Sequence, residues 1–417
     1  MEANDRSIAT FTMLAHGMFH TYELSIPLFV VVWLDTFSVS AAVLGAVVSV
    51  GYGLVGVGAI PSGLLADRYG SRTLILVSVA GMGIGFFLLS LATDIFFIGG
   101  AIVLWGLAAS LYHPAGLSLI SRGATDRGSV FAHHGVGGNI GTAFGPLIAA
   151  VLLVFFSWRV VVALLILPAI AVILLGYKIS FEDGNASTGA SVTGTDGGSA
   201  TTRSFNLRSM LAESRLLFSA GFTVIFVIVM LYGVYYRGLL TFLPDTIANL
   251  PRFEPVLLFG RTVEPAQYVY TGLLTVGIFG QYVGGNVTNH VRTEYALFGS
   301  LAVLVVAAFV FIPVSGVGVV PFLFVCAVLG FCLYATAPIY QVLIAESAAA
   351  DVHGLSYGFT YLGMFGVGAL GAALSGFVLT TFDAPTLFAV LGGFAAFATV
   401  LVLVALRLPS ATTGERA

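Results

Sequence analysis

The chain has 417 residues, of which 58% are hydrophobic and only 8% are charged, and its mean hydropathy is +1.03. This excludes an ordinary water-soluble domain, because such domains carry about 25% charged residues. The formal net charge of -3 is small for this length, so no nucleic-acid partner is expected. We expect a protein embedded in a lipid bilayer.

Apolar segments recur along the chain, and each is long enough as a helix to cross about 30 Å of hydrocarbon. They lie near 10–34, 40–66, 73–93, 95–121, 128–156, 158–178, 215–243, 267–289, 295–314, 320–345, 354–381 and 385–407. The fold class that we expect is an all-α polytopic membrane protein, with twelve transmembrane helices arranged as two six-helix bundles.

The expected organisation is an N-terminal bundle over residues 1–180, a cytoplasmic linker over 181–214 and a C-terminal bundle over 215–417. Residues 182–202 are rich in Gly, Ser and Thr, which predicts a flexible segment. Residues 203–214 could form a short interfacial helix. The first apolar segment is too long for a signal peptide, so we expect it to remain as a membrane span.

Basic residues are unevenly distributed between the loops. If the N-terminus is cytoplasmic, the outer loops hold only Arg159, Arg252 and Arg261, and nearly all other arginines lie on the inner side. Cytoplasmic loops carry the excess of basic residues in membrane proteins. We therefore expect a multi-pass protein of the cell (plasma) membrane with both termini in the cytoplasm. The longest outer loop, 244–265, is expected to cover an outer mouth.

The stretch "GLLADRYGSR", residues 63–72, ends the second span and contains Gly63, Asp67, Arg68, Gly70 and Arg72. A tight turn needs glycine, and an acid beside two arginines at a membrane face can form switchable ion pairs. This stretch resembles a signature of the major facilitator superfamily. The resemblance implies gating, with the aspartate holding the two halves together in an outward-open state. A simple turn flanked by positive charges is the alternative.

The fifth span contains "GVGGNIGTAFGP", in which Gly138, Gly141 and Gly145 share one helix face and Pro146 follows. Small residues at this spacing let another backbone approach closely. The segment looks like the Gly-Pro signature of exporters in this superfamily, which implies a bent helix at the interface between the halves. Ordinary close packing is the alternative.

Several stretches together resemble the fosmidomycin-resistance type of facilitator: "AHGMFHTYELSIPLF", "SLYHPAGLSLISR", "GGNIGTAFGPLIAAV", "YQVLIAES" and "HGLSYGFTY". The chain departs from that pattern at Phe19 and His20, where the family has an Asn-Asp pair, and at Ala115, where it has Glu. Both departures remove acidic side chains.

Polar residues interrupt the first span. His16, His20 and Glu23 lie within about 60° of one another on a helix. Because titratable groups facing lipid are costly, this stripe should face a water-filled cavity or partner helices. His113 and His134 are expected to lie about 10 Å in from the cytoplasmic face and to line the same cavity. We expect Glu23, assisted by His20 and His16, to carry a coupling proton; hydrogen bonding to neighbouring helices is the alternative.

Arg237 is the one basic residue inside a span, and an intramembrane arginine needs an anionic partner. It is expected to bind an anionic group of the substrate or to pair with Glu23, and snorkelling to the outer surface is the alternative. Further polar groups expected along the substrate pathway are Tyr236, Gln281, Tyr340 and Tyr361.

These observations favour a secondary active transporter of the major facilitator type that moves a small organic solute by alternating access. The first functional hypothesis is proton-coupled export of a drug-like or anionic compound, and the second is proton-coupled uptake of an organic anion. A membrane metalloenzyme using His16, His20, His113, His133, His134 and Glu23 is a distant third. We expect no enzyme activity, no metal and no cofactor. The expected partners are the substrate, H⁺ and lipid, and the expected state is a monomer.

Overall fold

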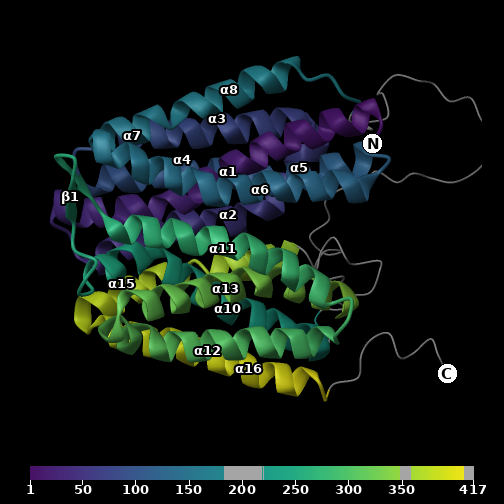
Figure 1. Ribbon diagram of the computed structural model, residues 1–417. Helices are drawn as coiled ribbons and strands as arrows, with labels where there is room; N and C mark the ends of the chain where they lie inside the picture. The colour runs from purple at the N-terminus through teal and green to yellow at the C-terminus, as the bar shows by residue number, and fades with distance from the viewer. Residues whose placement is uncertain (183–217, 219, 348–357, 408–417) are drawn as a thin grey trace, which may run out of the picture.

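The computed structural model describes residues 1–182, 218, 220–347 and 358–407. The predicted flexible segment, apart from residue 182, and the predicted interfacial helix lie outside these residues. The helices run side by side in two groups, an upper N-terminal half and a lower C-terminal half in Figure 1.

The N-terminal half contains α1 (Ala3–Phe37), α2 (Ala41–Tyr69), α3 (Ser71–Leu89), α4 (Ile95–Ser110), α5 (Tyr112–Gly123), α6 (Arg127–Phe155), α7 (Trp158–Leu164) and α8 (Ile166–Lys178). The C-terminal half contains α10 (Ala220–Ala248), β1 (Val256–Leu258), β2 (Arg261–Val263), α11 (Pro265–Val287), α12 (Thr293–Val317), α13 (Val319–Ser347), η2 (Leu362–Val367), α15 (Leu370–Thr381) and α16 (Ala384–Ala405). We call the end where α1 begins and α16 ends the terminal end, and the opposite end, with β1 and β2, the hairpin end (Figure 1).

Among the described residues, 11 helices are long and apolar enough to cross a membrane. They include the pairs α4–α5 and α7–α8, each of which forms one span. The twelfth expected span corresponds to α11, whose 23 residues include Gln267, Tyr270 and Gln281. These polar residues lower its hydropathy, and Tyr270 uses its hydroxyl to bond the other half, donating to the Leu24 carbonyl at 3.1 Å. The predicted all-α membrane architecture is confirmed.

Helix α1 begins at Ala3 instead of near residue 10. The reason is a buried aspartate that the hydropathy pattern did not reveal. The Asp5 carboxylate accepts hydrogen bonds from the backbone N–H groups of Thr125 and Asp126, both at 2.9 Å. Because a buried carboxylate needs such donors, this contact fixes the start of α1 against the α5–α6 turn.

Aspartates also set where three helices begin. Asp94, Asp126 and Asp383 precede α4, α6 and α16, and each accepts a backbone N–H of the first turn. A capping oxygen satisfies a donor that the helix itself leaves unpaired. Hydrogen bonding to the charged form lowers the pKa of all three carboxyls: from Phe97 N–H at Asp94, from Ser129 at Asp126 and from Thr386 at Asp383.

The turn between α2 and α3 depends on Gly70, which has a φ of 83°. Residues other than glycine rarely adopt this left-handed region. The glycine requirement inferred from the sequence is therefore a backbone requirement at this position.

Small residues let the two halves pack backbone to backbone along α2. A Cβ added at Gly56 would lie 2.2 Å from the Gly366 nitrogen, and one added at Gly45 would lie 2.5 Å from the Ala372 oxygen. Closer to the hairpin end, the Ala42 N–H donates to Thr380 Oγ1 at 2.8 Å. These contacts run from the middle of α2 to its hairpin end, so the halves are closed together on that side.

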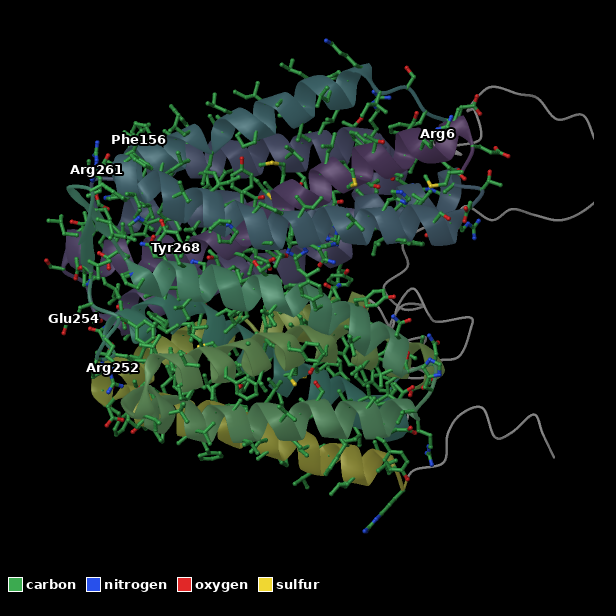
Figure 2. All side chains as sticks on the ribbon, viewed as in Figure 1. Arg6, Phe156, Arg252, Glu254, Arg261 and Tyr268 are labelled. Carbon is green, nitrogen blue, oxygen red and sulfur yellow. The ribbon has the colours of Figure 1, made fainter. Side chains whose placement is uncertain are left out.

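The segment between α10 and α11, predicted as the longest outer loop, contains a two-stranded hairpin. Helix α10 continues to Ala248, and β1 and β2 then form an antiparallel hairpin in which Leu258 pairs with Arg261. The Arg261 guanidinium lies 5.7 Å from the ring of Phe155 at the end of α6. Figure 2 shows Arg261 beside this end of the N-terminal half. The hairpin therefore reaches across from one half to the other.

Candidate functional site

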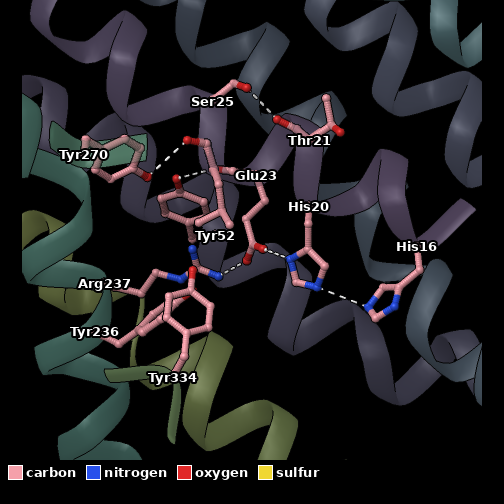
Figure 3. Close-up of polar contacts among 11 residues, drawn as sticks. His16, His20, Thr21, Glu23, Ser25, Tyr52, Tyr236, Arg237, Tyr270 and Tyr334 are labelled. Carbon is pink, nitrogen blue, oxygen red and sulfur yellow. Dashed lines mark hydrogen bonds and ion pairs between the residues drawn. The ribbon is translucent and has the colours of Figure 1, made fainter. Parts of the chain in front are cut away.

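The centre of the site is an ion pair between Glu23 on α1 and Arg237 on α10. Both side chains are 1% exposed, and each comes from a different half (Figure 3). The expected pairing of these residues is present, and burial excludes snorkelling of Arg237 to the surface. Removing one partner would leave an uncompensated buried charge, which is strongly unfavourable.

Aromatic rings surround the guanidinium. Its carbon lies 4.1 Å from the ring centre of Tyr52, and 5.3 Å from those of Tyr236 and Phe365. A ring face within about 6 Å attracts a cation electrostatically. Two further hydrogen bonds hold this shell: Tyr52 donates to the Glu23 carbonyl at 3.0 Å, and the Tyr236 and Tyr334 hydroxyls lie 3.2 Å apart. Arg237 Nε has no hydrogen-bond partner among the described residues.

A row of histidines continues from the ion pair along α1 towards the terminal end (Figure 3). His20 Nδ1 donates to the second carboxylate oxygen of Glu23 at 2.7 Å, and His20 Nε2 lies 3.1 Å from His16 Nε2. His16 Nδ1 donates to the backbone carbonyl of His134 at 2.8 Å. The predicted stripe is therefore one connected chain of polar contacts.

Helices α5 and α6 supply the other two histidines of the predicted pathway. The His134 ring stacks on His16 at 3.9 Å, and the His113 ring meets His16 edge-on at 5.2 Å. His113 also lies 5.4 Å from the ring of Tyr361, near η2 of the other half. The structure thus brings His16, His113 and His134 together, as expected.

The glycine stripe of α6 faces α1 in its own half. A Cβ added at Gly138 would lie 2.5 Å from the His16 ring, and one at Gly141 would lie 2.1 Å from the Gly17 oxygen. At Gly145 the obstacle would be the Thr21 backbone at 2.5 Å. The resemblance implied that these residues, with the helical Pro146, lie at the interface between the halves, and ordinary close packing was the alternative. The glycines pack closely against α1 in their own half, while α6 also packs on α11 of the other half.

The turn motif sits at the terminal end of α2. Asp67 pairs with Arg122 of α5 at 2.5 Å, not with Arg68 or Arg72, and this partner lies in the same half. Arg72 instead donates to backbone carbonyls at the end of α8, including Gly176 at 2.5 Å. A Cβ added at Gly63 would meet no atom within 4 Å. The predicted cluster exists, but Asp67 makes its described bond within the N-terminal half.

Not all predicted pathway residues join the centre. Tyr236 does, and Tyr340 stands one ring away, 5.7 Å from Tyr232. Gln281 is partly exposed on α11, and none of the described contacts connects it to Glu23. Tyr52, Tyr334 and Phe365 were not predicted from the sequence. A tyrosine flanked by glycines, as in "VGYGLVG" around Tyr52, was the available signal, because small neighbours allow other helices to approach its ring.

The π-helical turn η2 lies where Phe365 and Gly366 meet the site. Single π-helical turns often occur at functional sites, because they shift the register of a helix. Here the turn supplies both the ring that faces Arg237 and the backbone that contacts Gly56.

A bundle of membrane helices in two halves, with a buried ion pair between them, is typical of membrane transport proteins. The family model for the Major Facilitator Superfamily matches residues 10–372. The chain belongs to this superfamily, and it is a transporter and not an enzyme.

The chain has low sequence identity to two relatives that it matches over most of its length. The chain is similar to the fosmidomycin resistance protein of Escherichia coli (strain K12), with 26% identity over 70% of this chain and 67% of that protein. It is also similar to the uncharacterized MFS-type transporter YfnC of Bacillus subtilis (strain 168), with 27% identity over 84% of this chain and 76% of that one. A Na⁺, Li⁺, K⁺/H⁺ antiporter of Planococcus maritimus is 34% identical, over only 28% of this chain and 29% of that protein.

Solved structures show the same fold. A bacterial homologue of the human lysosomal transporter Spinster, in an inward-facing and occupied conformation, superposes with a TM-score of 0.74 and 15% identity over 98% of each chain. The nucleoside transporter NupG gives a TM-score of 0.73 at 11% identity, over 98% of this chain and 100% of that one. At these identities the likeness concerns the fold alone.

Proposed function

We propose that the chain is a proton-coupled transporter of a small organic anion, working as a monomer in the plasma membrane with both termini in the cytoplasm. The observation that carries the proposal is the buried Glu23–Arg237 pair between the halves. The excess of arginines at the terminal end supports the orientation.

The pair is suited to exchange partners. An anionic group of the substrate can replace the Glu23 carboxylate beside Arg237, because a guanidinium binds carboxylates and phosphates with the same donor geometry. Glu23 would then be a buried carboxylate without its counter-charge, and such a group takes up a proton. One anion and one proton therefore enter the site together, and the total charge between the halves stays constant.

This charge balance favours movement of the anion and proton in the same direction. An inward proton gradient then drives uptake of the anion. Antiport would require Glu23 to lose its proton as the anion binds, which places two negative charges beside one arginine. Uptake of an organic anion is therefore the function that the geometry supports best.

Export is the second candidate, and the printed names of the relatives favour it. One is a resistance protein and another an antiporter. In that mechanism a drug-like compound with hydrogen-bond donors or a positive charge would bind to Glu23. A proton from outside would then bind to Glu23 and displace the compound.

The test uses purified protein in liposomes that enclose a pH-sensitive dye. A panel of small carboxylates, phosphonates and phosphates, including fosmidomycin, is added outside. Cotransport of the anion and a proton into the liposome acidifies the lumen, whichever way each transporter molecule is inserted. Antiport makes the lumen alkaline. We expect acidification with at least one anion, and an alkaline change would favour export.

Glu23→Gln is expected to abolish the pH change while leaving exchange of labelled for unlabelled anion. Glu294→Gln is the matched control, because Glu294 pairs with Arg292 on the surface. Proton movement that persists in Glu23→Gln would remove Glu23 from the mechanism.

A further inference from the structure

The rings of His16, His20 and His113 meet beside the ion pair, and the anion and proton exchange at Glu23 and Arg237 uses none of them. One ring nitrogen from each of His16, His20 and His113 lies within 4.8 Å of the others. His16 and His20 lie on α1 and His113 lies on α5. The cluster therefore depends on the packing of these two helices as well as on the spacing of residues along α1.

The hydrogen bonds of this cluster fix which nitrogens are free. His16 Nδ1 faces a backbone carbonyl, and His20 Nδ1 faces the Glu23 carboxylate. Both partners only accept hydrogen bonds while Glu23 is ionised, so both Nδ1 atoms carry the hydrogen. The Nε2 atoms of His16 and His20 then direct their lone pairs towards each other across 3.1 Å.

Two facing lone pairs repel each other unless a cation lies between them. A proton could bridge these two nitrogens, but it would leave His113 Nε2 unused. That atom is buried and has no hydrogen-bond partner among the described residues, and His113 is 8% exposed. A metal ion can engage all three rings.

The distances fit such an ion. Zinc binds histidine nitrogen at about 2.0–2.1 Å with tetrahedral angles, which places ligand nitrogens about 3.3 Å apart. The His16–His20 separation of 3.1 Å is close to that value. The widest separation in the cluster is at most 4.8 Å, so the rings must close by at most about 1.5 Å when an ion binds.

The surrounding contacts match those that orient metal-binding histidines. Such histidines usually donate their second ring N–H to a carboxylate or a backbone carbonyl. His20 donates to Glu23, which Arg237 holds in place, and His16 donates to the His134 carbonyl. Gly138 leaves room for the His16 ring in this orientation.

We propose that His16, His20 and His113 form a binding site for one divalent transition-metal ion of the zinc type, with the Glu23 carboxylate orienting His20. Three imidazoles leave a fourth tetrahedral position for water or for an oxygen of the transported compound. His20 is 22% exposed, which gives the ion a route into the cluster. From the sequence we expected His113 to line the same cavity as His16 and expected no metal; the new observation is that the three ring nitrogens lie within 4.8 Å of one another.

The experiment measures Zn²⁺ binding to purified full-length protein by titration calorimetry, with Co²⁺ absorption reporting the coordination geometry. We expect one ion per chain and a Co²⁺ spectrum typical of tetrahedral coordination. His20→Ala and His113→Asn should each weaken binding by more than about 100-fold, and Glu23→Gln by about 10–100-fold through loss of the orienting bond. Elution as a single species on size exclusion shows that a variant is folded.

His133→Ala is the matched control, since His133 is exposed, lies next to His134 and bonds only to the Ser129 carbonyl of its own helix among the described contacts. It should bind Zn²⁺ like the wild type. The proposal is overturned if the wild type binds no stoichiometric ion, or if His133→Ala weakens binding as much as His113→Asn. Because no substrate or gradient is involved, failure of the proposed transport function would not affect this result.

Discussion

Glu23 of α1 and Arg237 of α10 are separated by 214 positions in the chain, yet they form a buried ion pair between the two halves. Each residue satisfies the charge of the other in a place that water barely reaches. Each residue is therefore needed for stability as long as the other is charged.

Breaking this pair from one side should destabilise the protein. Arg237→Gln leaves the Glu23 charge buried, which costs about 3–5 kcal/mol in the free energy of unfolding. The double variant Glu23→Gln with Arg237→Gln removes both charges and should recover much of that loss. Thermal unfolding in detergent measures both effects. A loss in the double variant equal to the sum of the losses in Arg237→Gln and Glu23→Gln would show that the charges do not depend on each other.

The packing of α6 on α1 should be sensitive to single methyl groups. Gly141→Ala would place a Cβ 2.1 Å from the Gly17 oxygen, so the helices must separate, at a cost of about 1–3 kcal/mol. Gly135→Ala lies on the same helix, where an added Cβ meets nothing within 4 Å. It should be neutral or stabilise the protein by up to about 1 kcal/mol. The difference between the two melting temperatures is the measurement.

The closed hairpin end should open when a side chain is added at the α2–η2 contact. Gly56→Ala clashes with the Gly366 backbone, whereas Gly53→Ala makes an ordinary contact at 3.7 Å with Ala369. We expect Gly56→Ala to increase the distance between spin labels placed on the hairpin ends of α2 and α15. Gly53→Ala should leave that distance unchanged. An unchanged distance in both variants would mean that the helices absorb the methyl group locally.

The Asp67–Arg122 pair should matter little for stability. Its side chains are 64% and 33% exposed, and exposed ion pairs contribute about 0–1 kcal/mol. Asp67→Asn is expected to keep the melting temperature and to change the transport rate, because the pair links the α2 terminus to α5. If Arg122→Gln and the double variant have the same effect as Asp67→Asn, the two residues act as a unit. Additive effects would assign Asp67 another partner during transport.

Hydropathy was sufficient to predict the helices of this fold, because a bilayer requires long apolar helices and leaves few alternatives. The helical period likewise placed His16, His20 and Glu23 on one face of α1. The partners across helices were harder to predict. Asp67 is next to Arg68 in the sequence but forms its ion pair with Arg122. Neighbouring positions in the sequence do not reveal which helix ends meet in the fold. Tyr52 and Phe365 escaped notice because aromatic residues in spans are usually ordinary packing.

The backbone contact between Gly56 and Gly366 has a mechanical consequence. Two backbone segments that touch without side chains between them can tilt against each other with little repacking. The contact of α2 with η2 at Gly56 and Gly366 is therefore suited to act as a pivot between the halves. When one half tilts about it, the hairpin end and the terminal end must move in opposite senses. A gap could then widen at one end only as it narrows at the other, and the membrane would not be left open from side to side.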